Sequence, residues 1–79
     1  MTVTVLLFAS YAESLGSSSL SLDMPEGSRV SDVVDAVRSR SAGKLPPRPL
    51  VAVNQAYASA TDLVAAGDEV AIIPPVAGG

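Results

Sequence analysis

Cysteine and histidine are both absent from this chain of 79 residues. Without cysteine there is no disulfide and no thiolate nucleophile, and without histidine there is no imidazole to bind a metal or to activate a serine. These two absences exclude the commonest zinc sites and the Ser/His and Cys/His types of catalysis. We therefore expect no resident metal, no bound cofactor and no catalysis by this chain alone.

Positive charge and aromatic residues are scarce as well. Five basic residues stand against eight acidic ones, which gives a net charge of −3, and the aromatic residues are two tyrosines and one phenylalanine. Nucleic-acid binding usually needs a basic stripe with interleaved aromatics, so we expect no nucleic-acid partner. The arginines at positions 38, 40 and 48 are expected to serve solubility.

Long apolar runs are missing too. Every apolar stretch is far shorter than the roughly 20 residues that cross a membrane as a helix. No lysine or arginine precedes Arg29, so residues 1–10 lack the basic start of a secretory signal. We expect no membrane association and a cytoplasmic location.

What the chain does contain is strand-like alternation. Residues 2–8 are rich in β-formers and place Val3, Val5 and Leu7 on one face, with Thr4, Leu6 and Phe8 on the other. The pattern also predicts strands over residues 20–24, 50–53 and 69–73, and a short one starting at Tyr57. A short helix is expected over residues 10–15, capped by Ser10 and ended by Gly16, and a capped single turn over residues 61–63.

The main helix is predicted over residues 30–40. Four valines recur there at helical spacing, as one apolar stripe, and acidic residues come early while basic residues come late. The sequence leaves open whether Ser28 or Ser31 caps this helix. The stripe consists of Val30, Val33, Val34 and Val37.

The order of these elements predicts an α+β fold, for which the ubiquitin-like β-grasp type is the leading option among several. One main helix would cover one face of a mixed sheet of four to five strands, in which the first and last strands pair in parallel. We expect the domain to occupy residues 1–74 and a flexible tail to occupy residues 75–79.

The tail itself suggests a chemical role. Gly78 and Gly79 lack a Cβ, so a chain that ends in them can pass through a narrow channel into the active site of another protein. Pro74 and Pro75 fix the backbone upstream and favour an extended exit. The tail is then a thin stem, through Val76 and Ala77, that carries a reactive carboxylate.

This ending closely resembles that of a known family. The run from Gly67-Asp68-Glu69-Val70 to Pro74-Pro75-Val76-Ala77-Gly78-Gly79 is similar to the end of the small, sulfur-carrying subunit of molybdopterin synthase, a ubiquitin-like sulfur carrier of the MoaD/ThiS type. The strand at residues 5–9, Glu13, Gly16 and the turn at residues 53–55 fit the same family in the same order. One departure is Ala12, because the family commonly has a basic residue there.

The resemblance implies a function. An ATP-dependent, E1-like adenylyltransferase would adenylate Gly79, and a sulfur donor would displace AMP to leave a C-terminal thiocarboxylate. The tail would enter the large subunit of molybdopterin synthase and donate sulfur to a pterin precursor of the molybdenum cofactor. Gly79 would carry the reacting atom, Gly78 and Ala77 the stem, and a heterotetramer with the large subunit is implied.

A partner surface follows from the strand alternation. If Val3, Val5 and Leu7 face the helix, then Leu6, Phe8 and Ile73 lie on the opposite face of the sheet, with Tyr57 nearby. Aromatic and aliphatic residues on such a face are typical interface anchors. The alternative is the reverse parity, with Phe8 in the core.

Three other functions remain open. The chain could carry sulfur for thiamine, cysteine or another thio-cofactor. It could be a ubiquitin-like modifier, in which Gly79 ends in an isopeptide bond to a lysine. It could also be a plain interaction domain with an incidental tail.

Overall fold

Seven elements follow one another in the part of the chain that the computed structural model describes, residues 1–41, 45–46 and 48–74. Strands and helices occur in the predicted order, and the main helix, the third strand and the last strand have the predicted bounds. The elements are β1 (Thr2–Leu7), α1 (Ala9–Leu15), β2 (Ser19–Asp23), α2 (Val30–Arg40), β3 (Leu50–Val53), β4 (Ala56–Ala58) and β5 (Glu69–Ile73).

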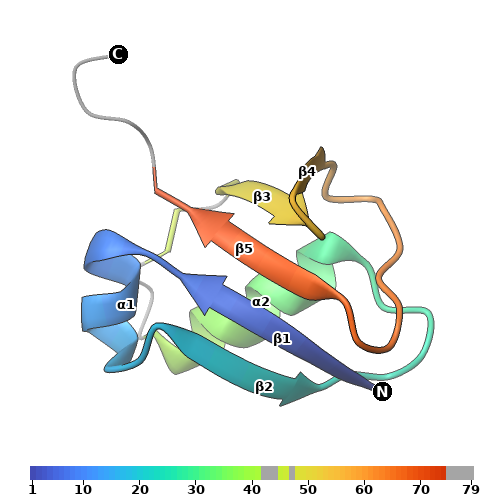
Figure 1. The fold of residues 1–79 in the computed structure, drawn as a ribbon, viewed down its shortest axis with the longest axis horizontal. Helices are drawn as coiled ribbons and strands as arrows, with labels where there is room; N and C mark the ends of the chain where they lie inside the picture. Colours follow the sequence, from blue (N-terminus) through green and yellow to red (C-terminus); the bar gives the residue numbers. More distant parts are fainter. Residues whose placement is uncertain (42–44, 47, 75–79) are drawn as a thin grey trace.

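The strands form one mixed sheet in the order β2-β1-β5-β3-β4 (Figure 1). β1 and β5 run in parallel at its centre, while β2, β3 and β4 pair antiparallel with their neighbours. β5 therefore has a hydrogen-bonded partner along both edges, and the C-terminal part of the domain lies in the middle of the sheet. This confirms the predicted α+β, β-grasp arrangement.

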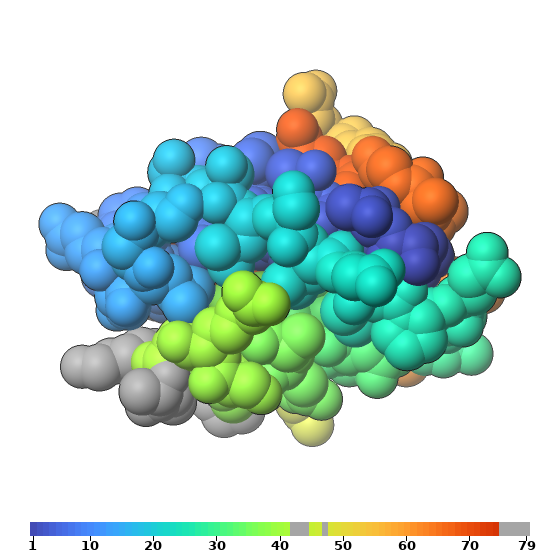
Figure 2. All heavy atoms as spheres, turned by 90° about the horizontal axis from the view of Figure 1, so that it is seen from below, coloured from blue at the N-terminus to red at the C-terminus, as the bar shows by residue number. Residues whose placement is uncertain are grey.

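α2 covers one face of this sheet. Its valine stripe is buried, and Val33 and Val37 are fully excluded from solvent. The strand residues that meet it are also fully buried, among them Val5, Val70 and Ile72. Figure 2 shows the two layers from the side, with α2 beneath the strands. Each buried valine contributes about 1.5 to 3 kcal/mol, which compensates for the modest helix propensity of valine.

The short helix α1 begins earlier than expected. Its N-cap is Phe8, without a side-chain hydrogen bond, so the prediction that Ser10 caps this helix was wrong. The reason is that Ala9 adopts φ +50°, which turns the chain out of β1 before Ser10 is reached. The predicted end is confirmed, because Gly16 closes the helix in the left-handed conformation at φ +72°.

The cap of α2 also differs from both serines that were considered. The N-cap is Arg29, whose backbone N–H donates to the Asp32 carboxylate at 2.8 Å. The N–H groups of Val30 and Ser31, which a capping serine would serve, donate instead to the carbonyls of Asp62 and Ala60. The segment after β4 therefore satisfies this helix end, and no serine is needed.

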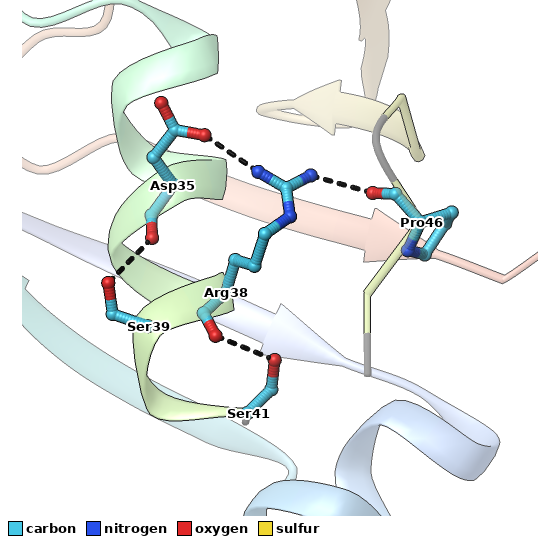
Figure 3. Close-up of polar contacts among 5 residues, drawn as sticks. All are labelled: Asp35, Arg38, Ser39, Ser41 and Pro46. Atoms are coloured by element: carbon cyan, nitrogen blue, oxygen red, sulfur yellow. Dashed lines mark hydrogen bonds and ion pairs between the residues drawn. The ribbon is translucent and has the colours of Figure 1, made fainter. Parts of the chain in front are cut away.

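Arg38 has a structural role beyond the expected one of solubility. Its guanidinium donates to the Asp35 carboxylate and to the Pro46 carbonyl, both at 2.7 Å, and so ties the end of α2 to the segment that leads into β3 (Figure 3). The hydroxyl of Ser41 donates to the Arg38 carbonyl at 3.0 Å. The last turn of α2 is thereby fixed relative to β3.

The segment between β4 and β5 contains a turn over residues 59–62, whereas the sequence predicted one over residues 61–63. The N–H of Asp62 donates to the Ser59 carbonyl, and the N–H of Ser59 donates to the Asp62 carboxylate. Leu63, which the sequence analysis placed within a capped single turn, instead forms an isolated bridge with Arg29. No helix within the described ranges is long and apolar enough to cross a membrane.

Candidate functional site

The chain leaves the domain at the end of the central strand. Pro74, half-buried, follows Ile73 directly, and β5 is held there by Leu50 of β3 on one side and by β1 on the other. The base of the predicted tail is therefore anchored in the centre of the sheet. Pro75, Val76, Ala77, Gly78 and Gly79 lie outside the described residues, so their predicted roles, and the boundary at residue 74, stay predictions.

The face of the sheet opposite α2 is uncovered by either helix of the described chain (Figures 1 and 2). We call it the open face. The predicted parity is confirmed, because Val3, Val5 and Leu7 are buried under α2 while Phe8 is 46% exposed. The alternative that places Phe8 in the core is therefore wrong.

A row of four residues crosses the open face in register. Tyr57 of β4 is paired with Ala52 of β3, Ala52 with Ala71 of β5, and Ala71 with Leu6 of β1. Direct cross-strand partners lie on the same face, so two large side chains stand at the ends of a row whose middle is formed by two methyl groups. The surface is consequently lower at the middle than at the ends.

A cavity of about 390 Å³ occupies that depression. We call it the open-face hollow. All four residues that the sequence analysis selected as partner contacts line it, although their role in binding stays a prediction. Its lining consists of those four, Leu6, Phe8, Tyr57 and Ile73, around the floor of Ala52 and Ala71, with Gln55 and Glu69 at the polar end.

The polar end is organised by a set of hydrogen bonds between two loops. Asn54 donates from its side chain to Asp68 at 2.9 Å and accepts from the Glu69 N–H at 3.0 Å. The backbone N–H of Ala65 donates to the other carboxylate oxygen of Asp68 at 2.7 Å. The hydrogen bond from Ala65, and then that from Asn54, hold the pKa of the Asp68 carboxyl below its usual value.

The turn that presents this end has an unusual backbone. Asn54 and Gln55, the two residues between β3 and β4, both have positive φ, at 50° and 71°. Two-residue hairpins favour this geometry because its twist matches that of the strands. Asparagine tolerates positive φ, whereas glutamine does so at a cost, which the side-chain bonds of Asn54 offset.

A second cavity, of about 450 Å³, lies between α2 and the β3–β4 hairpin. It is larger, but none of the residues that the sequence analysis selected as partner contacts line it. Val30 and Val34 of α2 form part of its wall, facing Val51 and Ala58 of the hairpin. We place the candidate site at the open-face hollow, because that cavity includes Ile73 next to the chain exit.

Sequence reasoning missed the floor of the hollow, and it did not bring Gln55 and Glu69 together at one end of it. Ala52 and Ala71 carry no chemical group that draws attention, and Gln55 and Glu69 are ordinary turn and strand-start residues. The signal that could have found the alanines is their position on the outward parity of two strands that were both predicted. The pairing of those strands was needed to show that they are neighbours.

Comparison with known proteins is consistent with this geometry. The model of the ThiS family matches residues 5–79. A molybdopterin synthase sulfur carrier subunit from Arabidopsis thaliana is 35% identical over 79 residues, which cover 98% of this chain and 82% of that protein. The expected resemblance to sulfur carriers is thereby confirmed.

Solved structures show the same fold. SAMP1 from Haloferax volcanii superposes with a TM-score of 0.84 at 31% identity, over 100% of both chains. A chain from the protein-protein complex of subunits 1 and 2 of the molybdopterin-converting factor from Helicobacter pylori 26695 gives a TM-score of 0.71 at 16% identity, also over 100% of both chains, and this likeness concerns the fold alone. With a family model that spans nearly its whole length, the chain belongs to the ThiS family.

Proposed function

We propose that this chain is the sulfur-carrying small subunit of a molybdopterin synthase. The observation that carries the proposal is the 35% identity to such a subunit over 98% of the chain. The position of the chain exit supports it, because the last described residues leave the sheet beside an uncovered, partly apolar face. In this role the carrier supplies the sulfur, while the large subunit supplies the pocket and the acid–base groups.

The proposed chemistry takes place at the carbonyl carbon of Gly79. An oxygen of the Gly79 carboxylate attacks the α-phosphate of ATP in an E1-like adenylyltransferase, and pyrophosphate leaves. A sulfur donor at the oxidation level of sulfide then attacks the acyl carbon and expels AMP, so that a C–S bond replaces the C–O bond to AMP. The product is a thiocarboxylate, and no oxidant or reductant is consumed.

Sulfur transfer follows in the large subunit. The thiocarboxylate sulfur attacks an electrophilic carbon of the pterin precursor and displaces an oxygen leaving group, so that a C–S bond replaces a C–O bond and a thioester forms. Water then cleaves this thioester, which leaves the sulfur on the pterin as a thiolate and returns the carboxylate of Gly79. Two such transfers place the two sulfurs of the dithiolene. A heterotetramer of two small and two large subunits is the assembly that we propose, because the resemblance to this family implies it.

In this proposal the described domain orients the tail. β5 is held between β1 and β3 and leads directly to the chain exit. Pro74, the first residue after the strand, restricts the backbone there. Restricting the stem before it enters a channel reduces the conformational entropy that binding costs. The apolar residues of the open face, Leu6, Phe8, Tyr57 and Ile73, are the proposed contacts with the partner.

Mass spectrometry of the protein from its native cell tests the chemistry. We expect a fraction of intact chains with a mass gain at Gly79 that corresponds to exchange of one oxygen for one sulfur. Reconstitution with a candidate large subunit and the pterin precursor then identifies the pathway. A variant with one alanine added after Gly79 should fold normally and lose sulfur transfer, and full activity of this variant would refute the mechanism.

One observation favours a second function. SAMP1 from Haloferax volcanii is 31% identical to this chain with full coverage of both chains, and a second solved structure carries the name small archaeal modifier protein 1 in full. As a modifier, the chain would end in an isopeptide bond between Gly79 and a target lysine. The same experiment separates the two functions, because conjugates would appear as Gly79 linked to lysine side chains of other proteins. Carriers for thiamine or cysteine would form the thiocarboxylate but fail in the reconstitution.

A further inference from the structure

The centre of the open face is occupied by two alanines, of which Ala52 is 7% exposed and Ala71 is half-buried. Ala52 and Ala71 are direct partners on β3 and β5, and they lie between Tyr57 and Leu6. Adjacent strands lie roughly 4.8 Å apart, so Tyr57 and Leu6 stand roughly 14 Å from each other across the hollow. This span leaves room for a side chain from another molecule to reach the sheet.

Paired alanines are a costly choice at such a position. Alanine is depleted in strands, and cross-strand pairs of larger apolar or β-branched residues stabilise sheets by about 0.2 to 1 kcal/mol relative to alanine pairs. On the same face of the sheet, neighbouring positions carry larger apolar side chains, such as Leu6 of β1 and Ile73 of β5. A local loss of stability that the fold does not require is typical of a functional position.

The hollow is also polarised. Phe8 and Ile73 form its apolar end, next to the chain exit, while Glu69 and Gln55 form the other end. No salt bridge joins the Glu69 carboxylate to another residue in the described part of the chain. A carboxylate at the rim of an apolar depression is complementary to a basic group that approaches beside an apolar side chain.

We propose that Ala52 and Ala71 form a socket for one bulky apolar side chain of the partner, with a basic residue of that partner beside Glu69. This inference rests on the proposed function, since the occupant is the large subunit of molybdopterin synthase. From Ala71 to Pro74 the chain advances three residues, roughly 10 Å along β5. A side chain seated in the socket therefore fixes the sheet close to the point where the tail departs, and the alanines determine which partners fit.

Filling the socket is the direct test. Ala71→Leu adds a side chain that points into the hollow, so the sheet can accept it without repacking the core. Ser21→Leu is the matched control, because Ser21 lies on the same face, paired with Thr4, but outside the hollow. Ala71→Ser changes the residue while keeping it small. Urea unfolding establishes that all three variants fold.

Affinity for the purified large subunit encoded in the same genome is then measured by titration calorimetry with the full chain. We expect Ala71→Leu to weaken binding at least about tenfold, and Ser21→Leu and Ala71→Ser to stay within about threefold of the unmodified chain. An unchanged affinity of folded Ala71→Leu overturns the socket. If Phe8→Asp weakens binding while Ala71→Leu does not, the socket fails and the proposed function stands.

The proposed pairing of Glu69 with a basic residue of the partner is tested separately. Glu69→Lys should slow association with the large subunit and reverse its dependence on salt, while Glu26→Lys, an exposed position in the turn after β2 with the same change of charge, should have a smaller effect. Equal effects of the two variants overturn the pairing at Glu69. If the unmodified chain neither binds the large subunit nor acquires a thiocarboxylate, the proposed function and the socket fall together.

Discussion

The side-chain amide of Asn54 donates a 2.9 Å hydrogen bond to the carboxylate of Asp68, fourteen residues further along the chain. A backbone hydrogen bond joins the same two segments, because the Asn54 N–H donates to the Glu69 carbonyl at 2.8 Å. These bonds join the β3–β4 turn to the start of β5. They therefore fix the polar end of the open-face hollow to the strand that carries the tail.

The first prediction concerns pH. Because the folded-state pKa of Asp68 is lowered, its contribution to stability is fully present above the pKa of the unfolded chain and is lost as pH falls through the folded pKa. Asp68→Asn should flatten the decrease in the free energy of unfolding below about pH 4. Urea titrations from neutral pH into the acid range measure this slope. Glu26→Gln, at an exposed turn residue, is the control, and an acid slope equal in both variants would contradict the role of Asp68.

The second prediction concerns Gly16. Its φ of +72° is unfavourable for any residue with a Cβ, although no atom lies within 4 Å of the place where that Cβ would stand. Gly16→Ala should lower the free energy of unfolding by about 1 kcal/mol through backbone strain alone. Gly16→Asn should cost less, because asparagine tolerates this conformation. Urea unfolding compares the variants, and equal losses for alanine and asparagine would argue against strain as the cause.

The sequence could predict the individual elements from their own periodicity, and the order of the elements could predict the β-grasp arrangement. The valine stripe of α2 and the alternation in β1 follow from helical and strand periodicity, and the structure buries the expected side of each. The helix caps could not be predicted in this way. The N–H groups of Val30 and Ser31 are satisfied by carbonyls of Asp62 and Ala60, some thirty residues later, and local sequence contains no trace of that contact.

The candidate site likewise has one part that the sequence predicts and one part that it does not. Outward parity was enough to bring Leu6, Phe8 and Ile73 to one face, because parity is a property of each strand. The hollow depends on register, since only the pairing of Ala52 with Ala71 places two small residues side by side. Register is set by the hairpin turn and by the neighbouring strands together. The sequence therefore predicts which residues lie on the open face, but not that this face contains a hollow.

The third prediction concerns the contact between α2 and the segment before β3. Arg38 is one of the arginines that the sequence assigned to solubility, yet its guanidinium donates to the Pro46 carbonyl. Arg38→Gln should lower the free energy of unfolding by about 1 kcal/mol, because one charged donor to the backbone is lost while its side chain is only partly exposed. Arg40→Gln, an exposed change of the same charge, should have little effect in the same urea titration. A loss for Arg38→Gln as small as that for Arg40→Gln would contradict a stabilising role of the contact with Pro46.

The last prediction concerns Phe8, an exposed aromatic residue of the candidate interface. Phe8→Asp replaces an aromatic residue that is 46% exposed, and aspartate is favourable at the N-cap of α1, so the fold should be retained. Burying a carboxylate without a partner against an apolar surface costs free energy, and binding of the large subunit should weaken at least about thirtyfold. Leu63→Asp is the control, because Leu63 is 62% exposed but does not line the open-face hollow. Titration calorimetry on folded variants decides the matter, and binding by Phe8→Asp equal to that by Leu63→Asp would remove Phe8 from the interface.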